Sequence, residues 1–305
     1  MTDGASRVAV VGAGSIGTLV GARIHAGGHD VTLCLRSPVE CIVVESLGER
    51  STVSIRCATE PSQVGPVDWV LLATKSQDTE GAAGWLTELA GPDVAVVALQ
   101  NGVDHRERLA PLVPAGTPVL PALVYANVER VAPDHIIHRA GELIIVPEQQ
   151  PEAERLAAVM ARGGLEVRTE DDFLTASWNK LLGNVAGNPI TTLTMRRAEV
   201  LQDPDVLELA AGLLREAVAV GRAEGARLDE DDVQATLANY ATFPPDAGTS
   251  MLFDRLNGRR LEHEAITGAV VRRAAAHGIA VPLNQAILTL LRAVDQSAGG
   301  AAREA

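Results

Sequence analysis

Only two of the 26 basic residues in this chain are lysines, and one of them starts a row of polar side chains. A helix over residues 173–188 would present Lys180, Asn184 and Asn188, four residues apart, along one face. Pro189 should bend or end that helix. A solvated helix face is the ordinary interpretation of such a row. However, a lysine gives up a proton where an arginine does not, so the row is also a candidate for acid chemistry.

A second pattern lies near the N-terminus. The apolar run 8–11 predicts a strand buried on both faces, a helix follows through residue 26, and residues 30–35 predict another strand. Between the first strand and the helix stand Gly12, Ala13, Gly14, Ser15, Ile16 and Gly17. In this context Gly-x-Gly-x-x-Gly predicts a dinucleotide site, with Gly12, Gly14, Ser15, Ile16 and Gly17 as cofactor-binding residues at the helix N-terminus. A tight turn without a ligand is the alternative.

The residue after the second strand indicates which dinucleotide is bound. Sites specific for NAD usually place a carboxylate there for the ribose 2′-hydroxyl, whereas this chain has Arg36 followed by Ser37. A guanidinium and a hydroxyl suit a 2′-phosphate, so we expect NADP(H), bound as NADPH for a reduction. The alternative is that Arg36 is an exposed surface arginine.

Further strands are predicted at residues 53–56, 68–73, 94–99, 119–128, 143–146 and 165–168. Two of them end in polar residues, because 68–73 is followed by Lys75 and 94–99 is followed by Asn101. The carboxyl ends of parallel strands line the ligand crevice of such a sheet, so both side chains should lie at the cofactor edge. The Asn101-Gly102 pair also suits a simple turn.

From residue 170 onward the pattern is helical. Helices are predicted over 173–188, 204–225, from Asp229 to about 242, over 261–277 and from Pro282 to about 295, with a frayed tail over 296–305. The fold class is therefore α/β, an N-terminal Rossmann-type parallel-sheet domain followed by an all-α domain. We expect the domains to be 1–169, which binds NADP, and 170–305, which holds the substrate and the catalytic group.

The overall composition excludes several classes of function. A net charge of −13 argues against nucleic-acid or anionic-membrane partners, and no apolar run approaches the length of a membrane span. Cys34, Cys41 and Cys57 form no Cys-x-x-Cys pair, which fits a reducing cytoplasm. The seven scattered histidines bring no cluster of ligands, so no metal is expected. The oligomeric state stays open, with room for a homodimer.

Together these landmarks resemble the ketopantoate reductase family (2-dehydropantoate 2-reductases), NADPH-dependent enzymes of pantothenate biosynthesis whose helical half is similar to that of 6-phosphogluconate dehydrogenases. The matching pieces run from residue 8 to about 284. They are the glycine loop, Lys75 with Gln77, Asn101-Gly102, Trp178-x-Lys180-Leu181-x2-Asn184-x3-Asn188-Pro189, Ser250-Met251-Leu252-x-Asp254, Gly258-Arg259-x2-Glu262 and His277-Gly278-Ile279-x2-Pro282.

The resemblance implies roles for the candidate residues. It implies that Lys180 is the general acid for the ketone oxygen of a 2-keto acid. It implies that Asn184, Asn188 and Ser250 bind substrate oxygens and that Glu262 accepts the substrate hydroxyl. Lys75 and Asn101 resemble the family's cofactor-side residues, and Asn101 also touches substrate. Ser250 could instead cap a helix, and Glu262 could pair with Arg259 or Arg260 on the surface.

Two departures concern the substrate side. Ala198 stands where many members have a further asparagine, and Phe253 stands where a polar residue is common. A related D-2-hydroxyacid dehydrogenase or 2-keto acid reductase is therefore one alternative, although Glu262 favours a hydroxylated substrate because a buried carboxylate without a donor is costly. A dinucleotide-binding protein without turnover is the other, and it gives no reason for Lys180 and Asn184 to occur together with Glu262.

Overall fold

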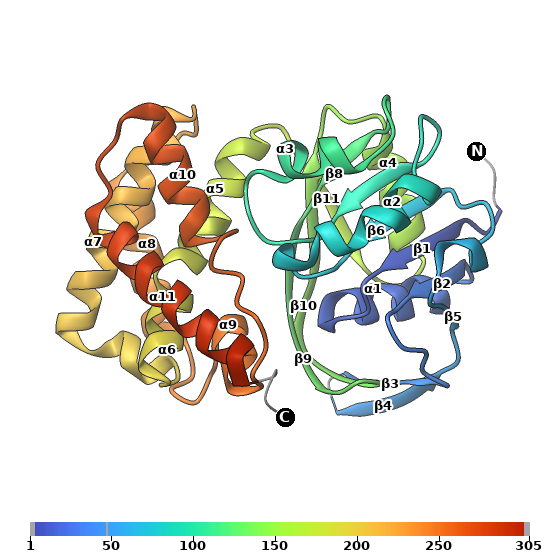
Figure 1. The fold of residues 1–305 in the computed structure, drawn as a ribbon, viewed down its shortest axis with the longest axis horizontal. Coiled ribbons are helices and arrows are strands. Elements are labelled where there is room, and N and C mark those ends of the chain that lie inside the picture. The colour runs from blue at the N-terminus through green and yellow to red at the C-terminus, as the bar shows by residue number, and fades with distance from the viewer. Residues whose placement is uncertain (1–3, 47, 302–305) are drawn as a thin grey trace. The chain divides into compact units, whose positions relative to one another are not determined.

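The protein is described here by a computed structural model that covers residues 4–46 and 48–301 (Figure 1). These residues form two compact units. The first contains residues up to 100 together with 105–173, and the second contains 101–104 together with the residues from 174 onward. The short segment 101–104 follows a strand of the first unit in sequence but packs with the helices of the second.

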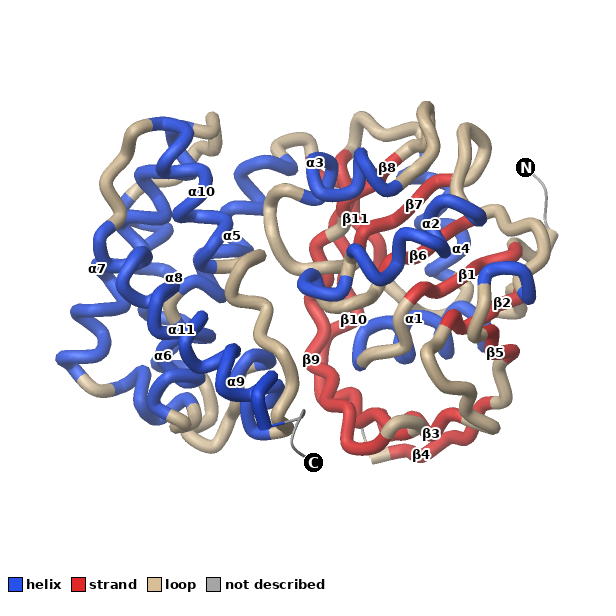
Figure 2. Tube along the Cα trace, viewed as in Figure 1, coloured by secondary structure: helices blue, strands red, loops and turns tan. Residues whose placement is uncertain are grey.

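The first unit combines strands with a few short helices (Figure 2). Its strands are β1 (Arg7–Val11), β2 (Asp30–Cys34), β3 (Ile42–Ser46), β4 (Glu49–Val53), β5 (Arg56–Ala58), β6 (Trp69–Leu72), β7 (Ala95–Ala98), β8 (Val119–Pro121), β9 (Leu123–Ala132), β10 (His135–Pro147) and β11 (Glu166–Glu170). Its helices are α1 (Ser15–Ala26), α2 (Ala83–Leu89), α3 (His105–Leu109) and α4 (Glu152–Ala161).

Six of the strands form the parallel sheet that the sequence predicts, in the order β5-β2-β1-β6-β7-β8. The central strands β1, β6 and β7 are short apolar runs. Apart from Arg7, the first residue of β1, all their residues are buried, because helices and a second sheet cover their faces. Because the strands are parallel, the residues that follow β1, β2, β6 and β7 all leave the sheet at the same edge.

A second sheet was not predicted. It runs in the order β11-β10-β3-β4, and β9 pairs with β10 in antiparallel fashion. The 13 residues of β10 include the exposed stretch 139–141, with the charged Arg139 at its start and Glu142 directly after it, and Gly141 has a φ of +80° beside a shift in register. A bulge of this kind interrupts the apolar alternation, so the sequence revealed only residues 143–146 of this strand.

Two other strand predictions were wrong in their bounds. The predicted strand 53–56 falls on the connection between β4, which ends at Val53, and β5, which begins at Arg56. The predicted strand 119–128 is two strands, since β8 belongs to the parallel sheet and β9 to the second sheet. A continuous apolar run carries no mark of a change of sheet, because both environments select the same residue types.

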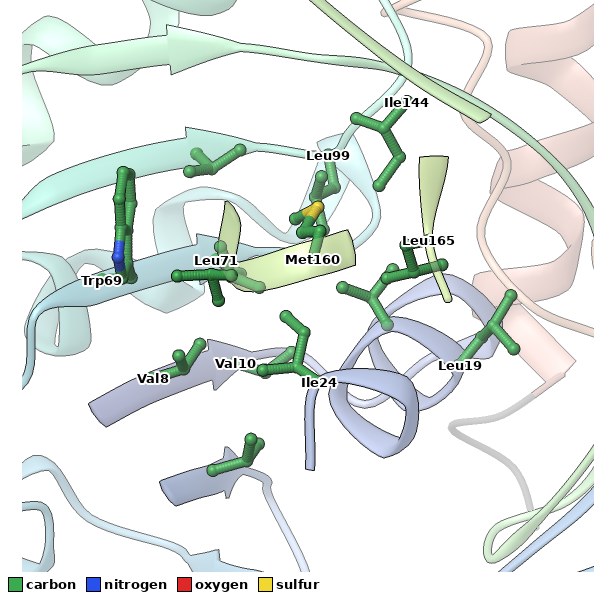
Figure 3. Packing of buried hydrophobic residues seen from close by; sticks show 14 of the residues in the cluster. Val8, Val10, Leu19, Ile24, Trp69, Leu71, Leu99, Ile144, Met160 and Leu165 are labelled. Carbon is green, nitrogen blue, oxygen red and sulfur yellow. The ribbon is translucent and has the colours of Figure 1, made fainter. Parts of the chain in front are cut away.

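The first unit has apolar cores on both faces of its parallel sheet. One joins the side chains of β1, β2 and β6 to α1, α4 and the second sheet (Figure 3). Leu19 and Ile24 of α1 lie in it beside Met160 and Leu165, as the close view shows. The other core joins the opposite faces of β1, β6 and β7 to α2 and α3.

The second unit is helical. Its helices are α5 (Phe173–Val185), α6 (Gly187–Thr194), α7 (Pro204–Ala223), α8 (Glu230–Thr242), α9 (Ser250–Leu256), α10 (Thr267–His277) and α11 (Pro282–Ala301). Trp178 of α5 lies against Gly221 of α7, where an added Cβ would come within 3.0 Å of the indole ring. The Asp203 carboxylate and the Asp229 carboxylate cap α7 and α8.

Two predicted helix bounds differ from the structure. The helix predicted over 261–277 begins only at Thr267, because residues 263–266 form turns. Ahead of these turns, the backbone N–H of Leu261 donates to Asp295 Oδ1 at 2.7 Å. The last helix continues to Ala301 instead of ending near 295, and residues 302–305 of the expected tail lie outside the described part.

The predicted helix 173–188 is two helices, broken at Ala186. Pro189 lies in the first turn of α6, where its missing N–H costs no intrahelical bond. The buried Tyr240 of α8 stabilises the break, because its hydroxyl accepts the Gly187 N–H at 3.0 Å and donates toward the Gly183 carbonyl at 3.3 Å. The Tyr240 hydroxyl therefore helps to set the direction of α6, the helix that carries Asn188.

We predict that Tyr240→Phe lowers the free energy of unfolding of the helical unit by about 1–3 kcal/mol, since the buried Gly187 N–H would lose its acceptor. Urea denaturation followed by circular dichroism measures this change. The matched control is Tyr125→Phe, because Tyr125 is 38% exposed on β9. Equal midpoints for the two variants would contradict the role given to the Tyr240 hydroxyl.

Candidate functional site

The glycine loop follows β1 and has the geometry of a phosphate-binding turn. Gly12 has a φ of +97°, and a Cβ there would come within 2.6 Å of the Thr74 backbone nitrogen. A Cβ on Gly17 would lie 2.0 Å from the Gly12 carbonyl oxygen. A Cβ on Gly14 would meet only the Ala73 carbonyl oxygen, at 4.0 Å, so the backbone of Gly14 stays open to a ligand.

Helix α1 begins directly after this loop, and its first turn has no side-chain cap. The N–H groups at Ser15, Ile16 and Gly17 have no partner within the helix, because an α-helix leaves its first amides unbonded. Residues 14–16 are half-buried rather than enclosed. Unbonded N–H groups at a helix N-terminus, directly after a loop with glycines at 12 and 14, fit the pyrophosphate of a dinucleotide.

Arg36 and Lys75 leave the parallel sheet at the same edge as the glycine loop. Arg36 follows β2, and the Gly12 N–H donates to the carbonyl of Cys34 at the end of that strand at 3.1 Å. Arg36 is exposed, which leaves its guanidinium accessible to a phosphate. Lys75 follows β6 and is half-buried.

Gln100, a residue the sequence did not single out, holds the loop that carries Lys75. Its buried side-chain amide lies 3.0 Å from the Thr74 carbonyl and 2.9 Å from the Thr79 hydroxyl. Its carbonyl lies 2.8 Å from the His105 Nε2. The sequence signal for Gln100 is the polar pair Gln100-Asn101 directly after a buried strand.

The polar row of the helical unit survives the break between α5 and α6. The Asn184 amide donates to the Lys180 carbonyl at 3.4 Å, and the Asn188 amide donates to the Asn184 side-chain oxygen at 3.3 Å. Lys180 and Asn184 are half-buried and Asn188 is buried, so the row is not an ordinary solvated face.

Asn101 joins Lys180 to Glu262 within the helical unit. The Lys180 Nζ donates to Asn101 Oδ1 at 3.1 Å, and Asn101 Nδ2 donates to Glu262 Oε2 at 3.2 Å. One primary amide therefore accepts from the ammonium and donates to the carboxylate. This arrangement makes Asn101 more than a turn residue, and it brings together three residues that are far apart in sequence.

The surroundings of Lys180 change its acidity. Loss of hydration on burial lowers the pKa of Lys180 to about 8, while the Glu262 carboxylate acts in the opposite direction. With that pKa most Lys180 side chains still carry their proton at pH 7. The group is thus charged yet a much better proton donor than an ordinary lysine.

Glu262 is 4% exposed, so the alternative of a surface carboxylate is wrong. The capping alternative for Ser250 is also wrong, because Thr249 caps α9 and its hydroxyl accepts the Leu252 N–H at 3.3 Å. Thr249 Oγ1 also lies 2.7 Å from Thr191 Oγ1 of α6. Ser250 is exposed in the first turn of α9, beside the helix that carries Asn188.

The two departures from the family pattern have defined environments. Ala198 is buried and its N–H donates to the Ala247 carbonyl at 2.8 Å. The Phe253 ring lies against Gly248, and the Arg197 guanidinium is 5.7 Å from its centre. Neither side chain supplies a hydrogen-bonding group.

In the described part of the chain, no three His, Cys, Asp or Glu side chains gather in a way that would hold a metal ion. No helix there is long and apolar enough to cross a bilayer.

Comparison with known proteins gives matches along most of the chain. Residues 8–150 match the family model "Ketopantoate reductase PanE/ApbA", and residues 172–295 match "Ketopantoate reductase PanE/ApbA C terminal". A 2-dehydropantoate 2-reductase from Caulobacter vibrioides is 39% identical over 94% of this chain and 98% of its own.

Solved structures agree with this similarity. A dimeric ketopantoate reductase from Staphylococcus aureus superposes with a TM-score of 0.87, at 25% identity over 96% of this chain and 99% of the other. A D-mandelate dehydrogenase bound to NADH and anilino(oxo)acetate has a TM-score of 0.86 at 22% identity, over 96% of this chain and 99% of the other, which supports a common fold only.

Because the chain has only two lysines, its lysine side chains can be titrated individually. With 13C-labelled lysine, we predict that the Lys180 signal titrates near pH 8 and that Glu262→Gln lowers this midpoint further, since a charge that favours the ammonium is removed. Lys75→Arg assigns the two signals. A Lys180 midpoint near the ordinary value of about 10.4 would contradict the desolvated environment.

Proposed function

Because this chain belongs to the ketopantoate reductase family, we propose that it reduces 2-dehydropantoate (ketopantoate) to (R)-pantoate with NADPH, with Lys180 as the general acid. The relatives support an oxidoreductase that uses a nicotinamide dinucleotide. The choice of NADPH, the role of Lys180 and a place in pantothenate biosynthesis are the proposed part.

The observation that carries this proposal is the Asn101 amide between Lys180 and Glu262. When bound, the nicotinamide cofactor supplies the hydride that reduces the ketone carbon. Negative charge then develops on the ketone oxygen, which the Lys180 ammonium stabilises and protonates. Asn101 fixes the direction of the Lys180 Nζ, and the lowered pKa makes the transfer of the proton easier.

Ketopantoate carries a carboxylate, a ketone and a terminal hydroxyl, and the helical unit offers a partner for each. Asn184 and Asn188 supply amides along the row from Lys180, and Ser250 supplies an exposed hydroxyl for the carboxylate. The buried Glu262 accepts the terminal hydroxyl. A substrate without that hydroxyl would leave a buried carboxylate short of one hydrogen bond, which is costly.

The first unit is proposed to hold the cofactor. Gly12, Gly14, Ser15, Ile16 and Gly17 would receive the pyrophosphate, and the exposed Arg36 would pair with the 2′-phosphate that distinguishes NADPH from NADH. Lys75 and Asn101 would contact the ribose and nicotinamide side. The relative from Staphylococcus aureus is described as dimeric, which supports a homodimer as the assembly of this chain.

A reductase of another 2-keto acid is the second candidate, supported by Ala198 and Phe253, whose side chains offer no hydrogen bond where many family members have one. The D-mandelate dehydrogenase of the same fold illustrates that this architecture accepts other substrates. The two candidates differ in the need for Glu262, so comparison of substrates with and without a terminal hydroxyl separates them.

We predict that the protein oxidises NADPH faster with ketopantoate than with pyruvate, 2-ketoisovalerate or phenylglyoxylate. In Lys180→Ala, we expect turnover to fall at least about 100-fold, the usual contribution of a positioned general acid, while NADPH binding is retained. In the wild type, kcat/KM for reduction should fall as pH rises through about 8, because the ammonium loses its proton.

Absorbance at 340 nm measures turnover, and quenching of protein fluorescence measures NADPH binding. Lys75→Ala is the matched lysine control, and we expect it to weaken NADPH binding. Near-normal turnover of Lys180→Ala would rule out Lys180 as the acid, and faster turnover of a substrate without the hydroxyl would favour the second candidate.

We predict that Arg36→Ala raises the Kd for NADPH by about tenfold or more but hardly changes the Kd for NADH, because only NADPH carries the phosphate that the guanidinium pairs with. Titration of both cofactors against the same variant measures the two changes. Arg56→Ala, a nearby exposed arginine on β5, is the control for general loss of positive charge. Equal losses for NADPH and NADH would contradict the phosphate contact.

A further inference from the structure

Residues 101–104 connect the end of β7 to the helical unit in a constrained way. Gly102 has a φ of +119°, a conformation that other residues rarely adopt. Val103 packs against the apolar core of the helical unit. Asp104 is buried, and it is separated from Asn101 by only two residues. Any displacement of Asp104 is therefore passed to Asn101.

Asp104 is bound by Arg272 of α10. The Arg272 Nη2 lies 3.1 Å from Asp104 Oδ2 and donates to the Glu264 carbonyl at 3.0 Å. The Arg272 Nη1 donates to Glu264 Oε2 at 3.1 Å. Glu264 is in turn fixed by Arg292 of α11, whose Nε donates to Glu264 Oε1 at 2.7 Å. Asp104, Arg272, Glu264 and Arg292 thus form one continuous chain of charges.

This charge chain joins the two segments that carry the ends of the Asn101–Glu262 hydrogen bond. Asp104 belongs to the segment of Asn101, and Glu264 lies in the turns at residues 263–266, directly after Glu262. Residues 261–266 precede the first residue of α10, so they lie outside the regular hydrogen-bond pattern of that helix. A single guanidinium with donors on both sides is suited to hold two carboxylates at a set spacing.

We propose that Arg272 is a positioning residue of the reaction, because it holds the Asn101 segment and the Glu262 segment together and so keeps the Asn101 amide between Lys180 and Glu262. This inference rests on the proposed function of Lys180. In this proposal Arg272 does not touch substrate or cofactor. It acts through its bonds to Asp104 and Glu264.

The charge chain has a geometric role that its contribution to folding does not explain. The Arg272 side chain is 49% exposed, and exposed ion pairs ordinarily add little to stability. The Asp104 side chain, in contrast, is only 12% exposed and sits beside the segment that must be positioned. A displacement of about 1 Å at a catalytic contact can reduce turnover up to about 100-fold.

The test replaces Arg272 by glutamine and measures turnover of ketopantoate with NADPH. We expect kcat to fall about tenfold, with little change in the Kd for NADPH. Arg273→Gln is the matched control, because Arg273 is the next residue of the same helix and pairs with Glu224 instead. Asp104→Asn breaks the same contact from the other side and should lower kcat in the same way, which keeps the test valid if one variant folds poorly.

A double-mutant cycle with Asn101 separates positioning from a general structural role. If Arg272 acts through Asn101, Asn101→Ala with Arg272→Gln should be no slower than Asn101→Ala alone. Losses that multiply would overturn the proposal. Activities of Arg272→Gln and Asp104→Asn within twofold of Arg273→Gln would also overturn it.

A readout without turnover keeps this inference distinct from the proposed function. With 13C-labelled lysine, Arg272→Gln should lower the titration midpoint of Lys180, since the ammonium loses its fixed acceptor and the nearby carboxylate is less well placed, whereas Arg273→Gln should leave it unchanged. If the wild type fails to reduce ketopantoate, the proposed function falls, and the Lys180 titration still decides whether Arg272 positions the site. An unchanged midpoint in Arg272→Gln would overturn the inference.

Discussion

The ammonium of Lys180 lies where water solvates it poorly, and the neighbouring residues of the helical unit compensate for the lost hydration. Loss of hydration alone would favour a neutral amine, so a neighbouring negative charge is needed to keep the proton on. Glu262 supplies that charge, and the Asn101 amide bonds to both groups. Desolvation remains the larger effect, so the pKa of Lys180 is lower than that of an ordinary lysine. The side chain is nevertheless charged at neutral pH.

Two adjacent residues after β7, Gln100 and Asn101, form side-chain hydrogen bonds in different units. The Gln100 side chain fixes the loop after β6, which carries Lys75, whereas the Asn101 side chain bonds to Lys180 and Glu262. A parallel strand ends in loops at the edge where ligands bind, so this position is suited to such a double role. The glycine loop adds its own constraint at that edge, because its backbone is packed too closely for side chains at Gly12 and Gly17.

Membership in the ketopantoate reductase family explains the order of these elements but leaves the substrate end to this chain's own residues. The side chains of Ala198 and Phe253 carry no hydrogen-bonding group, whereas Glu262 is a buried carboxylate. The charge chain from Asp104 to Arg292 lies on parts of the helical unit that no motif marks. Two of its bonded members, Asp104 and Arg272, are 168 residues apart in sequence, and only the fold brings their charges into contact.

The sequence by itself determined the features that depend on local spacing. The glycine loop between β1 and α1, the polar row of Lys180, Asn184 and Asn188, and most buried strands of the parallel sheet follow from periodicity and from the needs of phosphate binding. It did not predict β3 and β4, which pair with each other, and the other neighbour of β3 is β10, a strand interrupted by polar residues and a bulge. The break between α5 and α6 was placed at Pro189 instead of Ala186, because the hydroxyl that stabilises it belongs to Tyr240, 53 residues further along the chain. The lowered pKa of Lys180, the amide of Asn101 between two charges and the Arg272 contact with Asp104 were decided only by the tertiary structure, since desolvation and long-range hydrogen bonds depend on which distant segments pack together.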